Sequence, residues 1–183
     1  PDSETVIRAA LEAMPGQGRV LDLGTGSGAL LLTVLAERND SAGIGIDASA
    51  GAVAVAGENA ARLGLSDRAQ ILQRNWTQTG WAGDLGRFDL VLANPPYVET
   101  DADLAPDVRE YEPPSALFAG PDGLDDYRIL VPQLPRLLVP GGVAVLEIGH
   151  RQGDAVTAIA QQAGFAATLC LDLAGRPRAL LLR

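Results

Sequence analysis

The chain of 183 residues contains no lysine, one cysteine and one histidine. The single cysteine, Cys170, excludes a disulfide within the chain and predicts a protein of the reducing cytoplasm. Cys170 lies in an apolar run, where we interpret it as a small core residue. Because His150 and Cys170 are each alone, they cannot form the ligand cluster that zinc needs, and we expect no metal site. His150 is expected at the surface or in packing around a site, with a general base as the alternative.

Long hydrophobic runs are also absent. No stretch approaches the ~18 uninterrupted apolar residues of a membrane span, and the N-terminus lacks the pattern of a signal peptide. The sequence therefore predicts no association with a membrane and a cytoplasmic location. The chain begins at Pro1 and not at a methionine, from which we expect the recorded sequence to be part of a longer one.

Basic residues are fewer than acidic ones, 14 against 23, which gives a formal net charge of −9. Direct binding of DNA or RNA is not expected, because it needs a broad basic face, although the arginines could still form a local patch. With 47% hydrophobic and 20% charged residues, the length suits one compact domain over residues 1–183. A monomer is the default expectation.

Helical and strand-like segments alternate along the chain. This alternation predicts an α/β fold with a mostly parallel sheet covered on both faces, and ligand sites at the carboxyl ends of the strands. A turn at 174–177 is expected to join the last two strands into an antiparallel hairpin. We expect strands near 19–23, 43–47, 69–73, 88–93, 143–148, 166–172 and 178–182, and helices near 4–14, 28–38, 51–63, 124–137 and 152–163.

Three alternating glycines follow the first strand, in the run Asp22-Leu23-Gly24-Thr25-Gly26-Ser27-Gly28. Glycines let the backbone approach a ligand closely, so this spacing alone suits a dinucleotide equally well, and glycines that serve packing only are the alternative. Asp22 distinguishes the ligands. A carboxylate just before the glycines is unfavourable for a pyrophosphate and suits a cationic amino group, which favours S-adenosylmethionine.

Side chains after the next two strands extend this pattern. Asp47 ends the second strand, where a carboxylate can accept both hydroxyls of an adenosine ribose; capping of the following helix is the alternative. Asn75 follows the third strand and could address the adenine edge. Trp76 could pack on the adenine, or it could be a core or rim residue.

The segment Asn94-Pro95-Pro96-Tyr97 directly follows the apolar strand at 88–93. The Asn94 side-chain oxygen and the Pro95 carbonyl can accept the two hydrogens of an amide or an exocyclic amine, and Tyr97 can stack on its plane. The two consecutive prolines fix the backbone that presents this carbonyl. The segment therefore suits methyl transfer to a planar nitrogen, with a proline-rich turn of no such role as the alternative.

These motifs together resemble the Rossmann-like class I methyltransferases and, among them, the release-factor glutamine methyltransferases. Asn-Pro-Pro-Tyr is shared with nucleic-acid amino-methyltransferases, whereas Glu-Pro-Pro-Ser-Ala-Leu at 112–117 and Asp-Leu-Ala-Gly-Arg at 172–176 favour the glutamine family. The resemblance covers nearly the whole chain, through the segments 1–5, 22–28, 94–97, 111–117, 123–128, 137–142, 147–149 and 172–176.

The resemblance implies a seven-stranded sheet, the cofactor S-adenosyl-L-methionine, and methyl transfer to a protein glutamine, most specifically in the Gly-Gly-Gln loop of peptide chain release factors. It also implies an N-terminal helical substrate domain, after whose junction this chain begins. The family usually has Asp where this chain has Asn75, which can still accept from the adenine amine. By the same resemblance, the catalytic residues are Asn94, Pro95, Pro96 and Tyr97, and the cofactor-binding residues are Asp22, Leu23, Gly24, Thr25, Gly26, Asp47, Asn75, Trp76 and Asn94.

Other functions stay open at this point. They are methylation of a ribosomal-protein glutamine, methylation of an adenine amine in nucleic acid, a dinucleotide-dependent oxidoreductase, and a cofactor-binding module without catalysis. The connection 98–123 is long and rich in Pro, Asp and Glu, and we expect it to cover the substrate channel. Its acidic residues could meet a basic partner, although a solvated loop is the commoner case.

Overall fold

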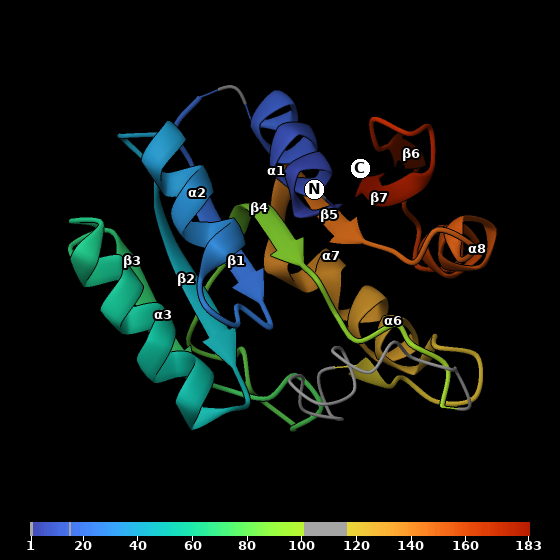
Figure 1. The fold of residues 1–183 in the computed structure, drawn as a ribbon, viewed down its shortest axis with the longest axis horizontal. Coiled ribbons are helices and arrows are strands. Elements are labelled where there is room, and N and C mark those ends of the chain that lie inside the picture. The colour runs from blue at the N-terminus through green and yellow to red at the C-terminus, as the bar shows by residue number, and fades with distance from the viewer. Residues whose placement is uncertain (1, 15, 101–116) are drawn as a thin grey trace.

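The computed structural model describes residues 2–14, 16–100 and 117–183, and its centre is a seven-stranded sheet in the order β3-β2-β1-β4-β5-β7-β6 (Figure 1). The strands from β3 to β5 in this order are parallel, whereas β7 is antiparallel to both β5 and β6. The predicted parallel sheet and terminal hairpin are thus confirmed. The strands are β1 Arg19–Leu23, β2 Ala42–Asp47, β3 Ala69–Gln73, β4 Phe88–Ala93, β5 Leu138–Glu147, β6 Ala167–Leu171 and β7 Pro177–Leu182.

Helices cover both faces of the sheet (Figure 1). Within the described ranges, no helix is long and apolar enough to cross a membrane. The helices are α1 Asp2–Ala13, α2 Ala29–Glu37, α3 Ala50–Arg62, α6 Asp125–Leu130, the 3-10 helix η1 Val131–Gln133, α7 Leu134–Leu137 and α8 Gly153–Gln162.

Two expected boundaries were wrong. The single helix expected over 124–137 is divided into α6, η1 and α7, because Pro132 and Pro135 lack the amide hydrogens that a continuous helix needs. Strand β5 begins at Leu138 and not near 143, with an irregular register to β4. A Cβ at Gly142 would lie 2.9 Å from the Phe88 carbonyl oxygen, so glycine allows this close passage of the two strands.

The alternation of side chains along each strand divides the core into two layers. Val20, Leu90 and Leu92 pack with α1, α2 and part of α3, whereas Leu21 and Val91 point to the opposite face, where α6, α7 and α8 pack. The core on both faces is apolar and buried, so the sheet forms a firm platform for the loops at its carboxyl edge.

Strands β3 and β4 are parallel but not neighbours in the sheet, and the connection between them lacks the helix that ordinarily joins parallel strands. Residues 74–87 contain turns but neither helix nor strand. Trp81 and Leu85 are buried and attach this connection to the core below α6 and α7. Because no helix fills the space, a cleft remains between the connection and α6–α7.

Candidate functional site

The glycine loop and the Asn94 turn meet at the carboxyl edge of the sheet. Leu23 of β1 is paired with Ala93 of β4, so the residues that follow them are neighbours. A Cβ at Gly24 would lie 4.0 Å from the backbone oxygen of Asn94. Two motifs far apart in the sequence therefore lie side by side, at the edge of the sheet where the sequence predicted them.

The end of β2 ties the glycine loop down. The amides of Gly24 and Thr25 both donate to the Ile46 carbonyl, at 2.9 and 2.8 Å. Gly24 and Gly26 have φ angles of 73° and 55°, a left-handed conformation that glycine adopts without strain. Leu23 contributes only its backbone to this edge, because its side chain is fully buried.

Asp22 is buried beneath this loop, with 1% of its surface exposed. Its Oδ2 accepts a hydrogen bond of 2.6 Å from the Thr25 hydroxyl, while its Oδ1 has no hydrogen-bond partner among the described residues. Burial raises the pKa of Asp22 to about 6, against the opposing effects of the Thr25 hydroxyl and the nearby Leu31 backbone amide, and the Asp47 carboxylate raises it further. An acceptor with this environment calls for a donor or a cation.

Asp47 joins the glycine loop to the start of α3. Its Oδ2 accepts from the Gly26 amide at 3.0 Å, and its Oδ1 accepts from the Ser49 amide at 2.9 Å. The cap of α3 itself is Ser49, whose hydroxyl accepts from the Ala52 amide. Each carboxylate oxygen can accept a further hydrogen bond, so Asp47 retains capacity for a ligand.

Asn75 and Trp76, which follow β3, already form hydrogen bonds within the protein through the Asn75 side-chain oxygen and the Trp76 indole nitrogen. Asn75 Oδ1 accepts from the amide and the hydroxyl of Thr77, at 2.9 and 2.8 Å. The indole nitrogen of Trp76 donates to Asp126 Oδ1 at 3.1 Å. A Cβ at Gly24 would lie 3.1 Å from Trp76 Cη2, so the ring packs against the glycine loop.

In the turn after β4, Asn94 is exposed, whereas the three residues that follow it are buried or half-buried. Pro95 is buried, whereas Pro96 and Tyr97 are half-buried. The Tyr97 carbonyl accepts a hydrogen bond of 2.9 Å from Gln152, the residue before α8. Gln152 therefore supports the Asn94 turn, which the sequence did not predict. The only signal in the sequence was its position at the start of a predicted helix.

The expected cover of the substrate channel falls mostly on residues 101–116, which lie outside the described residues, as does most of the 111–117 motif. The flanks of this segment are paired. The Val98 amide donates to Leu117, and the Ala119 amide donates back to Val98, at 2.8 and 2.9 Å. Both ends of the connection therefore start from one place beside the Asn94 turn.

The other chemically active side chains lie elsewhere. His150 is exposed, as expected for a surface residue, and Cys170 is partly exposed on β6, an edge strand. In the described part of the chain, no group of three His, Cys, Asp or Glu side chains could hold a metal ion.

A glycine loop after β1, an acid at the end of β2 and an Asn-Pro-Pro-Tyr turn after β4 are the features of a class I methyltransferase fold. The chain belongs to the Methyltransferase small domain family, which it matches over residues 4–109.

Curated relatives make the comparison more specific. The chain is 49% identical over 168 residues to the release factor glutamine methyltransferase of Caulobacter vibrioides, and 45% identical over 188 residues to that of Rhodospirillum rubrum. These matches cover 90% and 100% of this chain but only 57% and 56% of the relatives. The predicted resemblance is confirmed, and the chain spans little more than half the length of these relatives.

Solved structures support the fold. The chain matches the crystal structure of a ribosomal protein L11 methylase from Lactobacillus delbrueckii subsp. bulgaricus with a TM-score of 0.68 and 22% identity, covering 100% of this chain and 78% of that one. It matches a SAM-dependent methyltransferase from Thiobacillus denitrificans, in complex with S-adenosyl-L-homocysteine, with a TM-score of 0.52 and 21% identity. That match covers 78% of this chain and 47% of the other. At these identities the likeness concerns the fold alone.

Proposed function

We propose that this chain binds S-adenosyl-L-methionine and transfers its methyl group to the side-chain nitrogen of a protein glutamine, in the Gly-Gly-Gln loop of peptide chain release factors. The observation that carries the proposal is the adjacency of Gly24 and Asn94, which joins a cofactor loop to an amide-binding turn. The names of the curated relatives support the substrate. We further propose that the protein acts as a monomer in the cytoplasm.

The residues at the glycine loop fit this cofactor. The unpartnered Asp22 Oδ1 would accept from its amino group, and Asp47 would accept from the ribose hydroxyls. A Cβ at Gly26 would meet nothing within 4 Å, so the loop leaves open space beside its backbone. Asn75 would address the adenine edge through its amide nitrogen, because Thr77 already engages its oxygen. When bound, the cofactor supplies a methyl group on a positively charged sulfur.

The turn after β4 would hold the acceptor. An amide nitrogen is a poor nucleophile while its lone pair is delocalised, so it must be oriented toward the methyl group. The exposed Asn94 side chain and the Pro95 carbonyl would accept the two amide hydrogens, while Tyr97 stacks on the amide plane. Orientation and exclusion of water can supply several kcal/mol without a covalent intermediate. The proton that becomes acidic after methylation would leave to water.

The test is incubation of the purified chain with labelled S-adenosylmethionine and, separately, bacterial release factors, ribosomal proteins, DNA and RNA, followed by mass spectrometry of labelled products. We expect label on the glutamine of a Gly-Gly-Gln loop, and a rate of labelling about 100-fold lower with the Asn94→Ala variant. Label in nucleic acid alone would overturn the proposed substrate but not the proposed cofactor. Label on a ribosomal-protein glutamine alone would replace the release factor as the target.

A further inference from the structure

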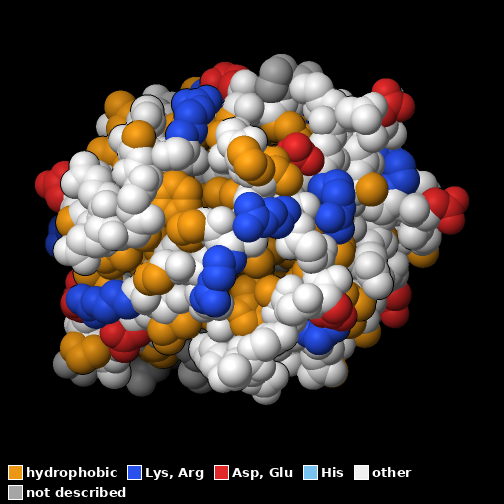
Figure 2. Space-filling model, turned by 180° about the vertical axis from the view of Figure 1, so that it is seen from behind, with side chains coloured by type: hydrophobic (Ala, Val, Ile, Leu, Met, Phe, Trp, Pro, Cys, Tyr) orange, Lys and Arg blue, Asp and Glu red, His pale blue; other side chains and the backbone are white. Residues whose placement is uncertain are grey.

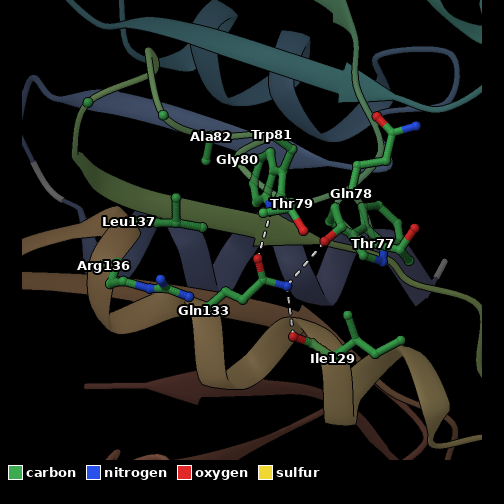
Figure 3. Close-up of a pocket in the computed structure, with 13 residues that line it drawn as sticks. Thr77, Gln78, Thr79, Gly80, Trp81, Ala82, Ile129, Gln133, Arg136 and Leu137 are labelled. Carbon is green, nitrogen blue, oxygen red and sulfur yellow. Dashed lines mark hydrogen bonds between the residues drawn. The ribbon is translucent and has the colours of Figure 1, made fainter.

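A cleft of about 500 Å³ lies between the 74–87 connection and α6–α7 (Figure 3), and Trp76 is the residue that it shares with the proposed cofactor site. Both tryptophans of the chain, Trp76 and Trp81, line it. Much of the lining is exposed, including Thr77 and Ile129, so this is an open surface cleft. Enclosed sites for small molecules bury most of their ligand, which this cleft cannot do.

The wall of the cleft is held by hydrogen bonds within the wall itself. The Trp81 indole donates to Gln133 Oε1 at 2.7 Å, and Gln133 Nε2 donates to the carbonyls of Trp76 and Ile129 at 3.2 and 2.8 Å (Figure 3). These polar groups already satisfy one another. The surface left for a partner is mixed. Its apolar part is the Ile129 side chain, which is 42% exposed, and the half-buried Trp76, whereas Leu137 is only 4% exposed. The exposed Thr77, Gln78 and Thr79 add polar groups.

One arginine lines the cleft, and two others lie next to its lining residue Gly86 without lining the cleft themselves. Arg136 lines it directly, and Arg87 donates to the Leu138 carbonyl just after α7. Arg19 donates to the Leu85 and Arg87 carbonyls. A Cβ at Gly86, which lines the cleft, would lie 3.1 Å from Arg19 Nη1, so the Arg19 guanidinium is next to the cleft wall.

The positive charge of these three arginines is not neutralised locally. Among the described residues, none of the guanidinium groups of Arg19, Arg87 and Arg136 forms an ion pair, although the chain as a whole has a net charge of −9. The Asp89 carboxylate accepts from the Arg19 backbone amide and not from its guanidinium. Seen from behind, the face opposite α1–α3 carries several arginines set among hydrophobic side chains (Figure 2).

We propose that this cleft binds an acidic segment of a partner protein. A hydrophobic side chain of that segment enters the cleft, and carboxylates of the same segment contact Arg19, Arg87 and Arg136. An apolar contact surrounded by polar and charged groups is the usual anatomy of such an interface. Three arginines on an acidic protein do not form the extended basic track that a nucleic-acid backbone needs. The docking uses neither Asp47 nor Asn94, and it shares only Trp76 with the residues proposed for the cofactor.

Intrinsic fluorescence can test this without a label, since the two tryptophans of the chain both line the cleft. The probe is a short peptide with a leucine flanked by glutamates, compared with the same peptide carrying glutamines. We expect a saturable change in fluorescence with the glutamate peptide, weakened by salt. Arg136→Glu should weaken its affinity about tenfold. The matched control is Arg62→Glu, an equal charge change at an exposed position on α3, which should have no effect.

Three outcomes of the peptide titrations would overturn the docking proposal. They are no fluorescence change with the glutamate peptide, equal affinity for the glutamine peptide, or equal weakening by Arg62→Glu and Arg136→Glu. Single-stranded RNA that competes with the peptide and binds more tightly would also overturn it in favour of nucleic acid. Circular dichroism of both variants separates lost binding from lost folding, and Ile129→Ser, which removes an exposed apolar contact, should weaken the peptide independently.

Discussion

At the scale of single residues, the buried carboxylate of Asp22 destabilises the cofactor-free protein when it is ionised. Its pKa is raised by burial to about 6 from an ordinary value of 3.8. The stability due to its protonation is therefore complete below about pH 4 and is lost as pH rises through about 6. Above that range, its ionisation lowers the free energy of unfolding by roughly 3 kcal/mol.

We expect Asp22→Asn to raise the melting temperature of the cofactor-free protein at about pH 8 and to change it little at about pH 4. Thermal melts at the two pH values measure this. The same variant should weaken binding of S-adenosylmethionine, because it removes the charge that faces the amino group. An equal gain in melting temperature at both pH values would contradict the charge explanation.

Asn94 and Asp47 have separable roles in the proposed reaction. Asn94→Ala should lower kcat about 100-fold with little change in cofactor affinity, because the exposed side chain acts on the acceptor. Asp47→Ala should raise the Kd for the cofactor, because it also releases Gly26 and Ser49. Calorimetric titration and steady-state kinetics with a release factor measure both quantities. If the two variants lose cofactor binding equally, the division of roles is wrong.

The sequence predicted the position of those candidate residues that lie at the ends of parallel strands. Asp22, Asp47 and Asn94 could be placed on one edge because every parallel strand brings its carboxyl end there. It could not predict the partners that hold them. Gln152 binds the Tyr97 carbonyl, and Asp126 binds the Trp76 indole. These contacts depend on how the whole chain folds, which local periodicity does not encode.

At the scale of elements, the glycine loop offers a matched pair of substitutions. Gly24→Ala and Gly26→Ala both place a side chain at positive φ, which costs roughly 1–2 kcal/mol. Only the Cβ at position 24 would also press on Trp76, at 3.1 Å, whereas the one at position 26 meets nothing within 4 Å. We therefore expect Gly24→Ala to destabilise the protein more, as measured by urea unfolding.

A Trp76→Leu background isolates this contact. The excess cost of Gly24→Ala over Gly26→Ala should shrink there, since the ring that it displaces is gone. An excess of unchanged size would mean that the backbone and not the indole causes the difference.

Periodicity predicted the elements, and it failed where proline or glycine interrupts them. The strand over 88–93 was predicted to the residue because its apolar run contains no glycine or proline and is interrupted only by Asp89. The first half of β5 was missed because Pro140, Gly141 and Gly142 indicate a turn, although the structure continues the strand through them. Pairing with β4 on both sides of this segment, of Leu138 with Phe88 and of Val143 with Leu90, overrides the local preference there.

At the scale of the whole molecule, ligand binding should appear as stability. A ligand that binds only the folded chain at about 100 times its Kd adds about 2.7 kcal/mol, or about 5 to 10 °C in melting temperature for a chain of this size. We expect such a shift with S-adenosylmethionine and with S-adenosylhomocysteine, but none with NAD. Differential scanning fluorimetry measures it, and a shift with NAD alone would favour the dinucleotide alternative.

The overall topology was predictable from alternation and from the hairpin turn, because few sheet arrangements accept that order of elements. The cleft beside Trp81 was not. It arises where residues 74–87 cross between parallel strands without a helix, and the sequence pattern alone does not show that space.

The pairing of β1 with β4 also has a consequence for how the site is formed. These strands join residues as far apart as Arg19 and Asp89, which are 70 positions apart in the chain and linked at 2.7 Å. Contacts of such sequence separation close large loops and form slowly during folding. A partly folded chain that contains only β1, β2 and β3 would already have the glycine loop but no acceptor turn. Recovery of catalysis on refolding should therefore lag behind recovery of cofactor binding.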